Sequence, residues 1–148
     1  MEFIEKFYHT DIDGGEIGEL KLCYCGKRTG ANDHSFGPAA RDNFWLIFLK
    51  EGSGIYTVGE ETFKLSAGDL FVAFPNRRIY YRADLGSVWS IGWVSVSAER
   101  FEDYLAMAGI TEEFPVVKIS DPEAMSGVID DLLFEIPKET LKSKFVCS

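Results

Sequence analysis

Short apolar segments recur along this sequence at intervals of about ten residues, with turn-forming residues between them. The segments are rich in aromatic and β-branched residues, which favour strands. In chain order they are IGELKLCYC, NFWLIFLK, IYTV, TFKL, LFVAF, IYYRA and VWSIGWVSVS. Tight hairpins are indicated at residues 51–54, 59–61 and 66–69, and KRTGANDHSFGP is predicted to be a long loop. This spacing predicts an antiparallel sandwich or barrel rather than a βαβ fold.

The composition changes after residue 97, where two helices are predicted. The first, AERFEDYLAMA, has Ser97 as its candidate N-cap and ends at Gly109. A short strand, VVKIS, follows, and Asp121 with Pro122 then marks the start of a second helix, EAMSGVIDDLLFEI, which Pro137 ends. The apolar face of this helix holds Met125, Val128, Ile129, Leu132 and Ile136. Both helices can simply pack on the barrel, or the second can also pair with another subunit.

The charge of the chain argues against direct contact with nucleic acid. The formal net charge is −9, and no basic helix or stripe offsets it. No apolar run approaches the length of a transmembrane helix, and the N-terminus MEFIEKFYHTD is too charged for a signal peptide. The sequence therefore predicts a cytoplasmic protein that does not associate with membranes.

The cysteines do not form a metal-binding pattern. Cys23 and Cys25 form a C-x-C pair, but no second pair of cysteines or histidines stands at metal-site spacing. Together with Cys147 they are expected to be reduced structural thiols.

Several motifs occur together, in a fixed order, between His34 and Trp93. They include the His-Ser-Phe-Gly-Pro loop, an Arg-Asp pair before an aromatic strand, a G-x-G hairpin at residues 52–54, L-x-A-G-D at residues 65–69, Phe-Pro at residues 74–75 and W-x-x-x-W at residues 89–93. In this combination the chain resembles, over about residues 17–100, the cupin-type sensor domain of AraC-family transcription regulators.

The resemblance implies a double-stranded β-helix, a cupin or jelly-roll barrel, followed by C-terminal α-helices. It implies an N-terminal arm over residues 1–16, a sensor barrel over 17–97, a helical dimerisation or packing segment over 98–137 and a loose tail over 138–148. In relatives the arm can fold over a bound ligand; the alternative is an edge strand. The barrel of such a domain binds a small effector, commonly a sugar, and the protein is a homodimer. Because the sequence ends at Ser148 without a helix-turn-helix segment, DNA binding is expected only through a domain outside this chain.

Cupins that bind a metal place histidines and a carboxylate at positions that correspond here to about Ala39, Arg41, Trp45 and Tyr80. None of these is a usual metal ligand, so the barrel is expected to hold no metal and no cofactor.

The same positions suggest a ligand-binding site instead. Alternation along the strands should point Arg41, Trp45 and Tyr80 into the barrel, where a sugar would meet aromatic faces and converging donors. A register slip of one residue would turn these side chains outward. The complete set of candidate ligand-binding residues is Arg41, Trp45, Tyr80, Arg82, Trp93 and His34.

Three functions remain open from the sequence. The first is an effector-sensing domain without enzymatic activity. The second is a metal-independent cupin epimerase or isomerase acting on a sugar, which needs a general base that the inferred strand positions do not supply. The third is a plain dimerisation domain, which would have a tightly packed aromatic core and no ligand-sized cavity.

Overall fold

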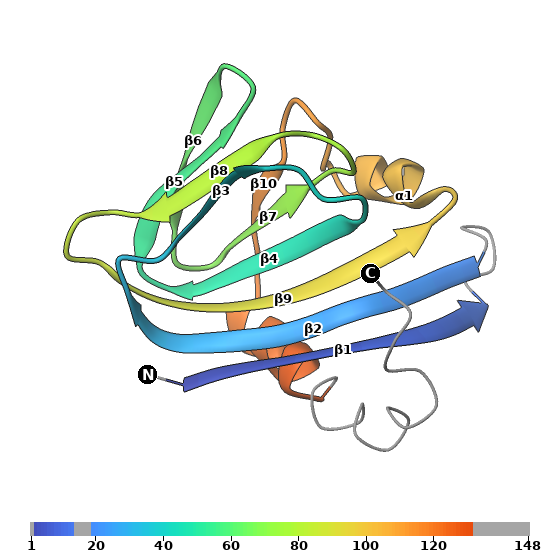
Figure 1. Ribbon diagram of the computed structural model, residues 1–148, viewed down its shortest axis with the longest axis horizontal. Coiled ribbons are helices and arrows are strands. Elements are labelled where there is room, and N and C mark those ends of the chain that lie inside the picture. The colour runs from blue at the N-terminus through green and yellow to red at the C-terminus, as the bar shows by residue number, and fades with distance from the viewer. Residues whose placement is uncertain (1, 14–18, 132–148) are drawn as a thin grey trace.

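The computed structural model describes the backbone of residues 2–13 and 19–131 and the side chains of residues 21–131. Two antiparallel sheets face each other across a common core (Figure 1). The larger sheet contains, in spatial order, β1 (Glu2–Asp13), β2 (Glu19–Asn32), β9 (Val88–Ala98), β4 (Phe44–Glu51), β7 (Asp69–Ala73) and β10 (Val116–Lys118). The smaller contains β3 (Ser35–Ala39), β8 (Ile79–Ala83), β5 (Ser53–Val58) and β6 (Glu61–Ser66). The predicted mainly β, antiparallel fold is confirmed.

The long loop predicted after the first strand is wrong. Strand β2 continues to Asn32, and β3 begins at Ser35, so only a tight turn separates them. Pairing between strands makes this segment extended, because Arg28 stands opposite Ile91 in β9 and Ser35 stands opposite Arg82 in β8. Such tertiary pairing overrides the low strand propensity of the Gly, Asn and Asp residues in this segment.

The N-terminal segment forms the edge strand of the larger sheet, which is one of the two alternatives that the sequence left open. Strand β1 pairs antiparallel with β2, from Glu2 opposite Thr29 to Asp13 opposite Glu19. Closure of this segment over a ligand stays a prediction.

Strand β4 is apolar along its length because both of its faces are covered. Its residues Trp45, Ile47 and Leu49 belong to the cluster between the two sheets, whereas Phe44 and Phe48 belong to a second cluster on the outer face of the larger sheet. The helical region covers this outer face, where Leu105 and Ile129 join the second cluster. A barrel with helices on one side therefore requires the run FWLIFL without the usual alternation.

Helix α1 (Phe101–Met107) begins later than the sequence predicts. Ser97 lies within β9, opposite Lys21, and cannot cap the helix; the N-cap is Arg100, which makes no side-chain capping hydrogen bond. Glu102 and Asp103 instead place negative charge in the first turn, where the helix dipole favours it. The predicted end at Gly109 is confirmed: this residue has a φ of +84° and donates its N–H to the carbonyl of Ala106.

The second helix starts as predicted, over residues 122–131. The Oδ1 atom of Asp121 accepts a hydrogen bond from the backbone N–H of Ala124 at 3.1 Å, so Asp121 is the N-cap. Ile129 is buried against the larger sheet, while Val128 is exposed. Leu132, Ile136 and the predicted tail over residues 138–148 lie outside the described residues. Pairing of this helix with a second subunit stays a prediction.

The expectation of three reduced thiols is wrong for one residue. Cys25 is buried and is not in a disulfide, but Cys23 is disulfide-bonded, and Cys147 lies outside the described residues. Disulfide pairing cannot be deduced from the spacing of cysteines alone.

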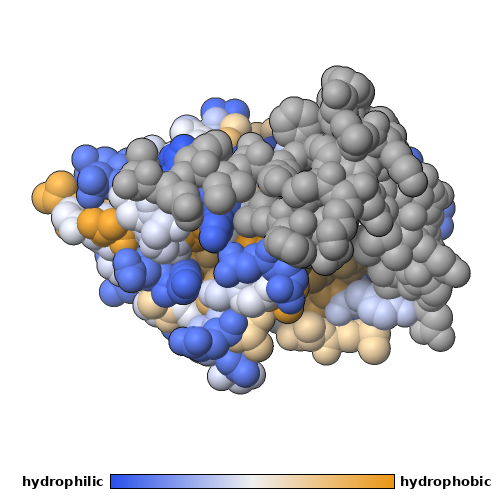
Figure 2. Space-filling model, turned by 90° about the horizontal axis from the view of Figure 1, so that it is seen from below, coloured by the Kyte–Doolittle hydropathy of each residue, from blue (hydrophilic) through white to orange (hydrophobic). Residues whose placement is uncertain are grey.

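The described surface is mostly hydrophilic on the face that Figure 2 shows, with a few apolar patches between the charged residues. Large exposed apolar side chains come from separate segments of the chain: Leu85, Val88, Met107, Phe114 and Val128. No helix within the described residues is long and apolar enough to cross a membrane.

Candidate functional site

A cavity of about 260 Å³ lies between the two sheets. Strands of both sheets and the segments between them contribute its walls. The lining residues are Arg28, His34, Ser35, Phe36, Arg41, Trp45, Ile47, Tyr81, Ile91 and Trp93. Small-molecule sites usually measure roughly 300–1,000 Å³, so this cavity lies just below that range and suits a small ligand.

Arg41 is the central feature of the cavity. Its Cζ atom lies 3.7 Å from the ring centroid of Phe36 and 3.8 Å from that of Trp45, so both aromatic rings lie against the guanidinium. Cation–π attraction stabilises this arrangement, more strongly where water is excluded. The backbone carbonyl of Arg41 accepts a hydrogen bond from the N–H of Asn76 at 2.6 Å, which anchors the segment between β3 and β4. The side chain is therefore held in one position before any ligand arrives.

The Nη1 atom of Arg41 is buried and has no hydrogen-bond partner among the described residues. No described carboxylate forms an ion pair with this guanidinium, so it does not pair with the neighbouring Asp42. Buried polar groups in proteins are nearly always hydrogen-bonded. A buried donor without a partner at the wall of a cavity is thus a position for a ligand acceptor.

Aromatic rings form most of the remaining wall. Trp45 stacks on Tyr24 with ring centroids 5.2 Å apart, and Tyr81 stacks on Phe36 at 5.5 Å. Trp93 reaches the cavity from β9, in the sheet opposite Tyr81. Flat apolar faces of this kind bind the C–H face of a sugar ring or another planar ligand.

His34 is a neutral hydrogen-bonding group in this cavity. Its Nδ1 atom lies 3.0 Å from Nη1 of Arg28. Burial, and then the positive charge of Arg28, lowers the pKa of His34 from 6.5 to about 4. Because an arginine can only donate, Nδ1 of His34 accepts, and the neutral ring carries its proton on Nε2. His34 therefore offers one further N–H donor near neutral pH.

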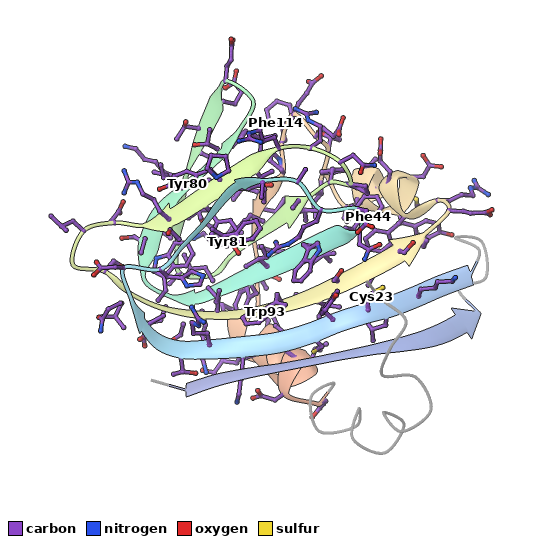
Figure 3. All side chains as sticks on the ribbon, viewed as in Figure 1. Cys23, Phe44, Tyr80, Tyr81, Trp93 and Phe114 are labelled. Carbon is purple, nitrogen blue, oxygen red and sulfur yellow. The ribbon has the colours of Figure 1, made fainter. Side chains whose placement is uncertain are left out.

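Four of the six predicted ligand-binding residues line the cavity: His34, Arg41, Trp45 and Trp93. Tyr80 and Arg82 do not. The interior position on β8 belongs to Tyr81, which is buried, whereas Tyr80 is half-buried and Arg82 is exposed. In Figure 3 Tyr81 lies on the side of β8 that faces the larger sheet, and Tyr80 lies on the other side.

The inward orientation predicted for Tyr80 and Arg82 is thus wrong by one residue. Pairing with β5 fixes the register: Tyr81 stands opposite the buried Tyr56, and Tyr80 stands opposite Thr57. A turn at Pro75 precedes β8, and the sequence does not specify its conformation. One residue more or less in that turn exchanges the two faces of the strand.

Sequence reasoning missed several residues of the cavity. Phe36 and Ser35 belong to the His-Ser-Phe-Gly-Pro motif, so the motif itself carried a signal for them. Arg28 had no such signal, because a charged residue in a strand is normally expected at the surface. The other lining residues not among the predicted six are Ile47, Tyr81 and Ile91.

The cavity is equipped for binding by stacking and by hydrogen-bond donation. None of its described lining residues is acidic, and two are arginines. Within the described residues no group of three His, Cys, Asp or Glu side chains could hold a metal ion. A larger groove of about 650 Å³ lies outside the barrel, beside α1, and its walls include Glu61, Glu102, Asp103, Glu112 and Glu113. That acidic groove has none of the preorganised donors that surround Arg41.

Two curated proteins are similar to this chain in sequence. The chain is 32% identical over 114 residues to the Msm operon regulatory protein of Streptococcus mutans, covering 77% of this chain and 40% of that protein. It is 21% identical over 99 residues to the lactose operon transcription activator of Staphylococcus xylosus, covering 67% of this chain and 36% of that protein. The chain thus spans well under half the length of these two regulators.

Among solved structures, that of the protein YhaK from Escherichia coli has a TM-score of 0.57 at 13% identity. The similarity covers 80% of this chain and 52% of YhaK, and it supports the cupin-like fold alone. A sequence model described as the AraC-like ligand binding domain matches residues 24–143, which is most of the chain. The chain therefore belongs to the family of AraC-like ligand binding domains.

Proposed function

We propose that this domain senses a small carbohydrate effector, bound in the cavity between its sheets, for a transcription regulator. The observation that carries the proposal is the guanidinium of Arg41, which is clamped between Phe36 and Trp45 and has a buried donor without a partner. Both curated relatives are named as operon regulators. DNA contact belongs, in this proposal, to a region outside this chain, and the helical segment after the barrel forms a homodimer.

A sugar ring would place its C–H face on Trp45 or Trp93 and its oxygens near Arg41 and His34. Stacking on the aromatic face supplies apolar contact, and the fixed donors select the orientation of the ring. The volume of about 260 Å³ suits one ring rather than a chain of several. Since the donors are already held in place, little conformational entropy is lost on binding.

The strand that carries Trp93 also contacts the helical segment. Gly92, the preceding residue, lies under Ile129 of the second helix on the opposite face of the sheet. A ligand that binds one arrangement of β9 and this helix more tightly than another would shift the population between them. This contact is the route by which occupancy of the cavity would reach a dimer partner or a DNA-binding region.

The two alternative functions fit the cavity less well. An epimerase needs a general base, but the pKa of His34 is lowered to about 4 and Nδ1 accepts a hydrogen bond from Arg28. The described lining residues include no carboxylate that could assist it. A plain dimerisation domain would fill its core, whereas this barrel retains a ligand-sized space.

The test is thermal unfolding of the domain against a panel of monosaccharides, oligosaccharides, sugar acids and sugar phosphates. A ligand at 100 times its Kd stabilises the folded state by about 2.7 kcal/mol, a readily measured shift. We expect one compound class to raise the Tm, Arg41→Ala to abolish the increase, and Arg82→Ala to leave it intact, because Arg82 is exposed and outside the cavity. The proposal fails if no compound shifts the Tm, or if the two arginine variants respond alike.

A further inference from the structure

The described lining of the cavity differs in charge from the whole chain. The sequence carries 24 acidic and 15 basic residues, yet the described lining residues include Arg28 and Arg41 and no acidic residue. Charges are normally paired when they are taken out of water. Arg41 forms no ion pair with a described carboxylate, so its guanidinium is a place for a negative charge from outside.

The geometry of Arg41 restricts how that charge can approach. Phe36 and Trp45 lie against the guanidinium, with ring centroids 3.7 and 3.8 Å from its Cζ atom, so a ligand would approach its N–H groups at the edge of the guanidinium. Nη1, one of the atoms at that edge, is buried and without a hydrogen-bond partner among the described residues. In-plane approach to a guanidinium edge is the geometry by which arginine binds carboxylate and phosphate oxygens in pairs.

The neighbouring groups favour the same kind of ligand. Arg28 adds a second guanidinium to the lining, and its Nη1 is oriented by Nδ1 of His34 at 3.0 Å. His34 is neutral near pH 7, so it donates a hydrogen bond without supplying a counter-charge. A neutral sugar hydroxyl could satisfy the open donor of Arg41, but it would leave the charge of this half-buried guanidinium uncompensated.

We infer that the effector carries an oxyanion, a carboxylate or a phosphate group, that docks against the in-plane edge of Arg41. The inference rests on the proposed function of the same cavity and specifies its ligand class: a sugar acid or a sugar phosphate rather than a neutral sugar. The ring of such a ligand lies against Trp45 and Trp93, and its anionic substituent lies at the arginines.

The first test uses simple oxyanions. Sodium acetate and sodium phosphate are compared with sodium chloride at equal ionic strength, with the Tm and tryptophan fluorescence as readouts. Trp45 contacts Arg41 directly, so its emission reports on the site. We expect at least one oxyanion to raise the Tm above chloride, Arg41→Met to lose that difference, and Arg82→Met to keep it. Phosphate also stabilises proteins generally, but that contribution would persist in Arg41→Met.

An equal response of wild type and Arg41→Met, or no difference from chloride in the wild type, overturns the inference. Arg41→Lys is the second variant, which guards against loss of folding in Arg41→Met. It keeps the charge but lacks the planar fork, so we expect a weaker oxyanion response at an unchanged far-UV circular dichroism spectrum.

The second test separates the inference from the proposed function. Calorimetric titrations compare D-glucose and D-galactose with their uronic acids and their 6-phosphates, ring for ring. We expect an anionic member to bind about 30-fold or more tightly than its neutral counterpart, and the better of the two anionic series identifies carboxylate or phosphate. A neutral sugar that binds as tightly overturns the inference and leaves the proposed function standing. An Arg41-dependent oxyanion response without binding of any sugar supports the inference and contradicts the carbohydrate proposal.

Discussion

Ile129 occupies the space that a side chain on Gly92 would need. A Cβ atom built on Gly92 would lie 2.6 Å from Cδ1 and 3.1 Å from Cγ2 of Ile129. The second helix therefore rests directly on the backbone of β9. Trp93, the next residue, lines the cavity on the other face of the same strand. Only the thickness of one sheet separates the ligand cavity from the helical segment.

This contact predicts that Gly92→Ala destabilises the domain. The added methyl group must displace Ile129 or the strand, and overpacking of this kind typically costs about 1–3 kcal/mol. Chemical denaturation measures the loss in the free energy of unfolding. In a double-mutant cycle, Ile129→Ala should remove much of the penalty, because the two atoms that collide are then no longer both present.

Gly127→Ala is the matched control for this prediction. It lies in the same helix, and nothing stands within 4 Å of a Cβ atom built there. Replacing glycine by alanine inside a helix is favourable by up to about 1 kcal/mol, so the sign of the effect should be opposite. A Gly92→Ala variant as stable as Gly127→Ala would contradict the packing described here.

The elements of the fold were predictable where local chemistry decides them. The hairpin at residues 59–61 and the capping of the second helix by Asp121 follow from residues at fixed turn and cap positions. The start of α1 was not predictable, because Ser97 is a good capping residue that pairing with Lys21 keeps in a strand. Strand β3 was not predictable either, because its composition is typical of a loop and only its pairing with β8 makes it a strand.

The candidate site could be predicted in part. Arg41, Trp45 and Trp93 were placed correctly at the cavity. For Trp45 and Trp93, alternate side chains of a strand point to opposite faces, so the strand itself sets their direction. The inward position on β8 was assigned to Tyr80 instead of Tyr81, because the register of β8 depends on the turn before it and on its pairing with β5. Arg28 could not be found, since its role depends on the position of His34 across a tight turn.

The buried carboxylate of the L-x-A-G-D motif explains a second prediction. Oδ2 of Asp69 accepts the backbone N–H of Ser66 at 2.8 Å, and Oδ1 lies 2.9 Å from Nζ of Lys118 in β10. Asp69→Ala breaks both contacts and leaves the N–H of Ser66 without its partner. We expect a loss of about 1–3 kcal/mol in the free energy of unfolding. Lys118→Ala should cost less than about 1 kcal/mol, because the lysine is largely exposed. Equal losses in the two variants, measured by urea denaturation, would contradict this assignment.

The register of β8 predicts unequal roles for two adjacent tyrosines. Tyr81 is buried among Phe36, Tyr56, Phe71 and Trp89, so Tyr81→Ala should cost about 3–5 kcal/mol, as large aromatic truncations in a core do. Tyr80 lies on the other face of the strand and is half-buried, so Tyr80→Ala should cost at most about 1 kcal/mol. Comparison of the two midpoints of denaturation checks the register directly. A larger loss of stability in Tyr80→Ala than in Tyr81→Ala would mean that Tyr80 faces inward, as the sequence predicted.

The environment of His34 predicts a pH dependence of stability. Its pKa is lowered in the folded state to about 4 from 6.5, by burial first and then by the charge of Arg28. Between these two values the unfolded chain binds more protons than the folded one, so the stabilising contribution is complete above about pH 6.5 and is lost as the pH falls toward 4. Partial exposure screens the site, and we expect the loss to be about 1–2 kcal/mol.

Urea denaturation between pH 4.5 and 7.5 measures this dependence in the wild type and in His34→Gln. Carboxylate titration contributes to both curves, so their difference isolates the histidine. We expect the wild type to lose more stability than His34→Gln as the pH falls from 6.5 to 4.5. Parallel curves would mean that His34 titrates normally and that Arg28 does not hold its Nδ1 atom as an acceptor. In that case Arg28 would no longer fix the tautomer of the neutral ring, and the assignment of the proton to Nε2 would fall.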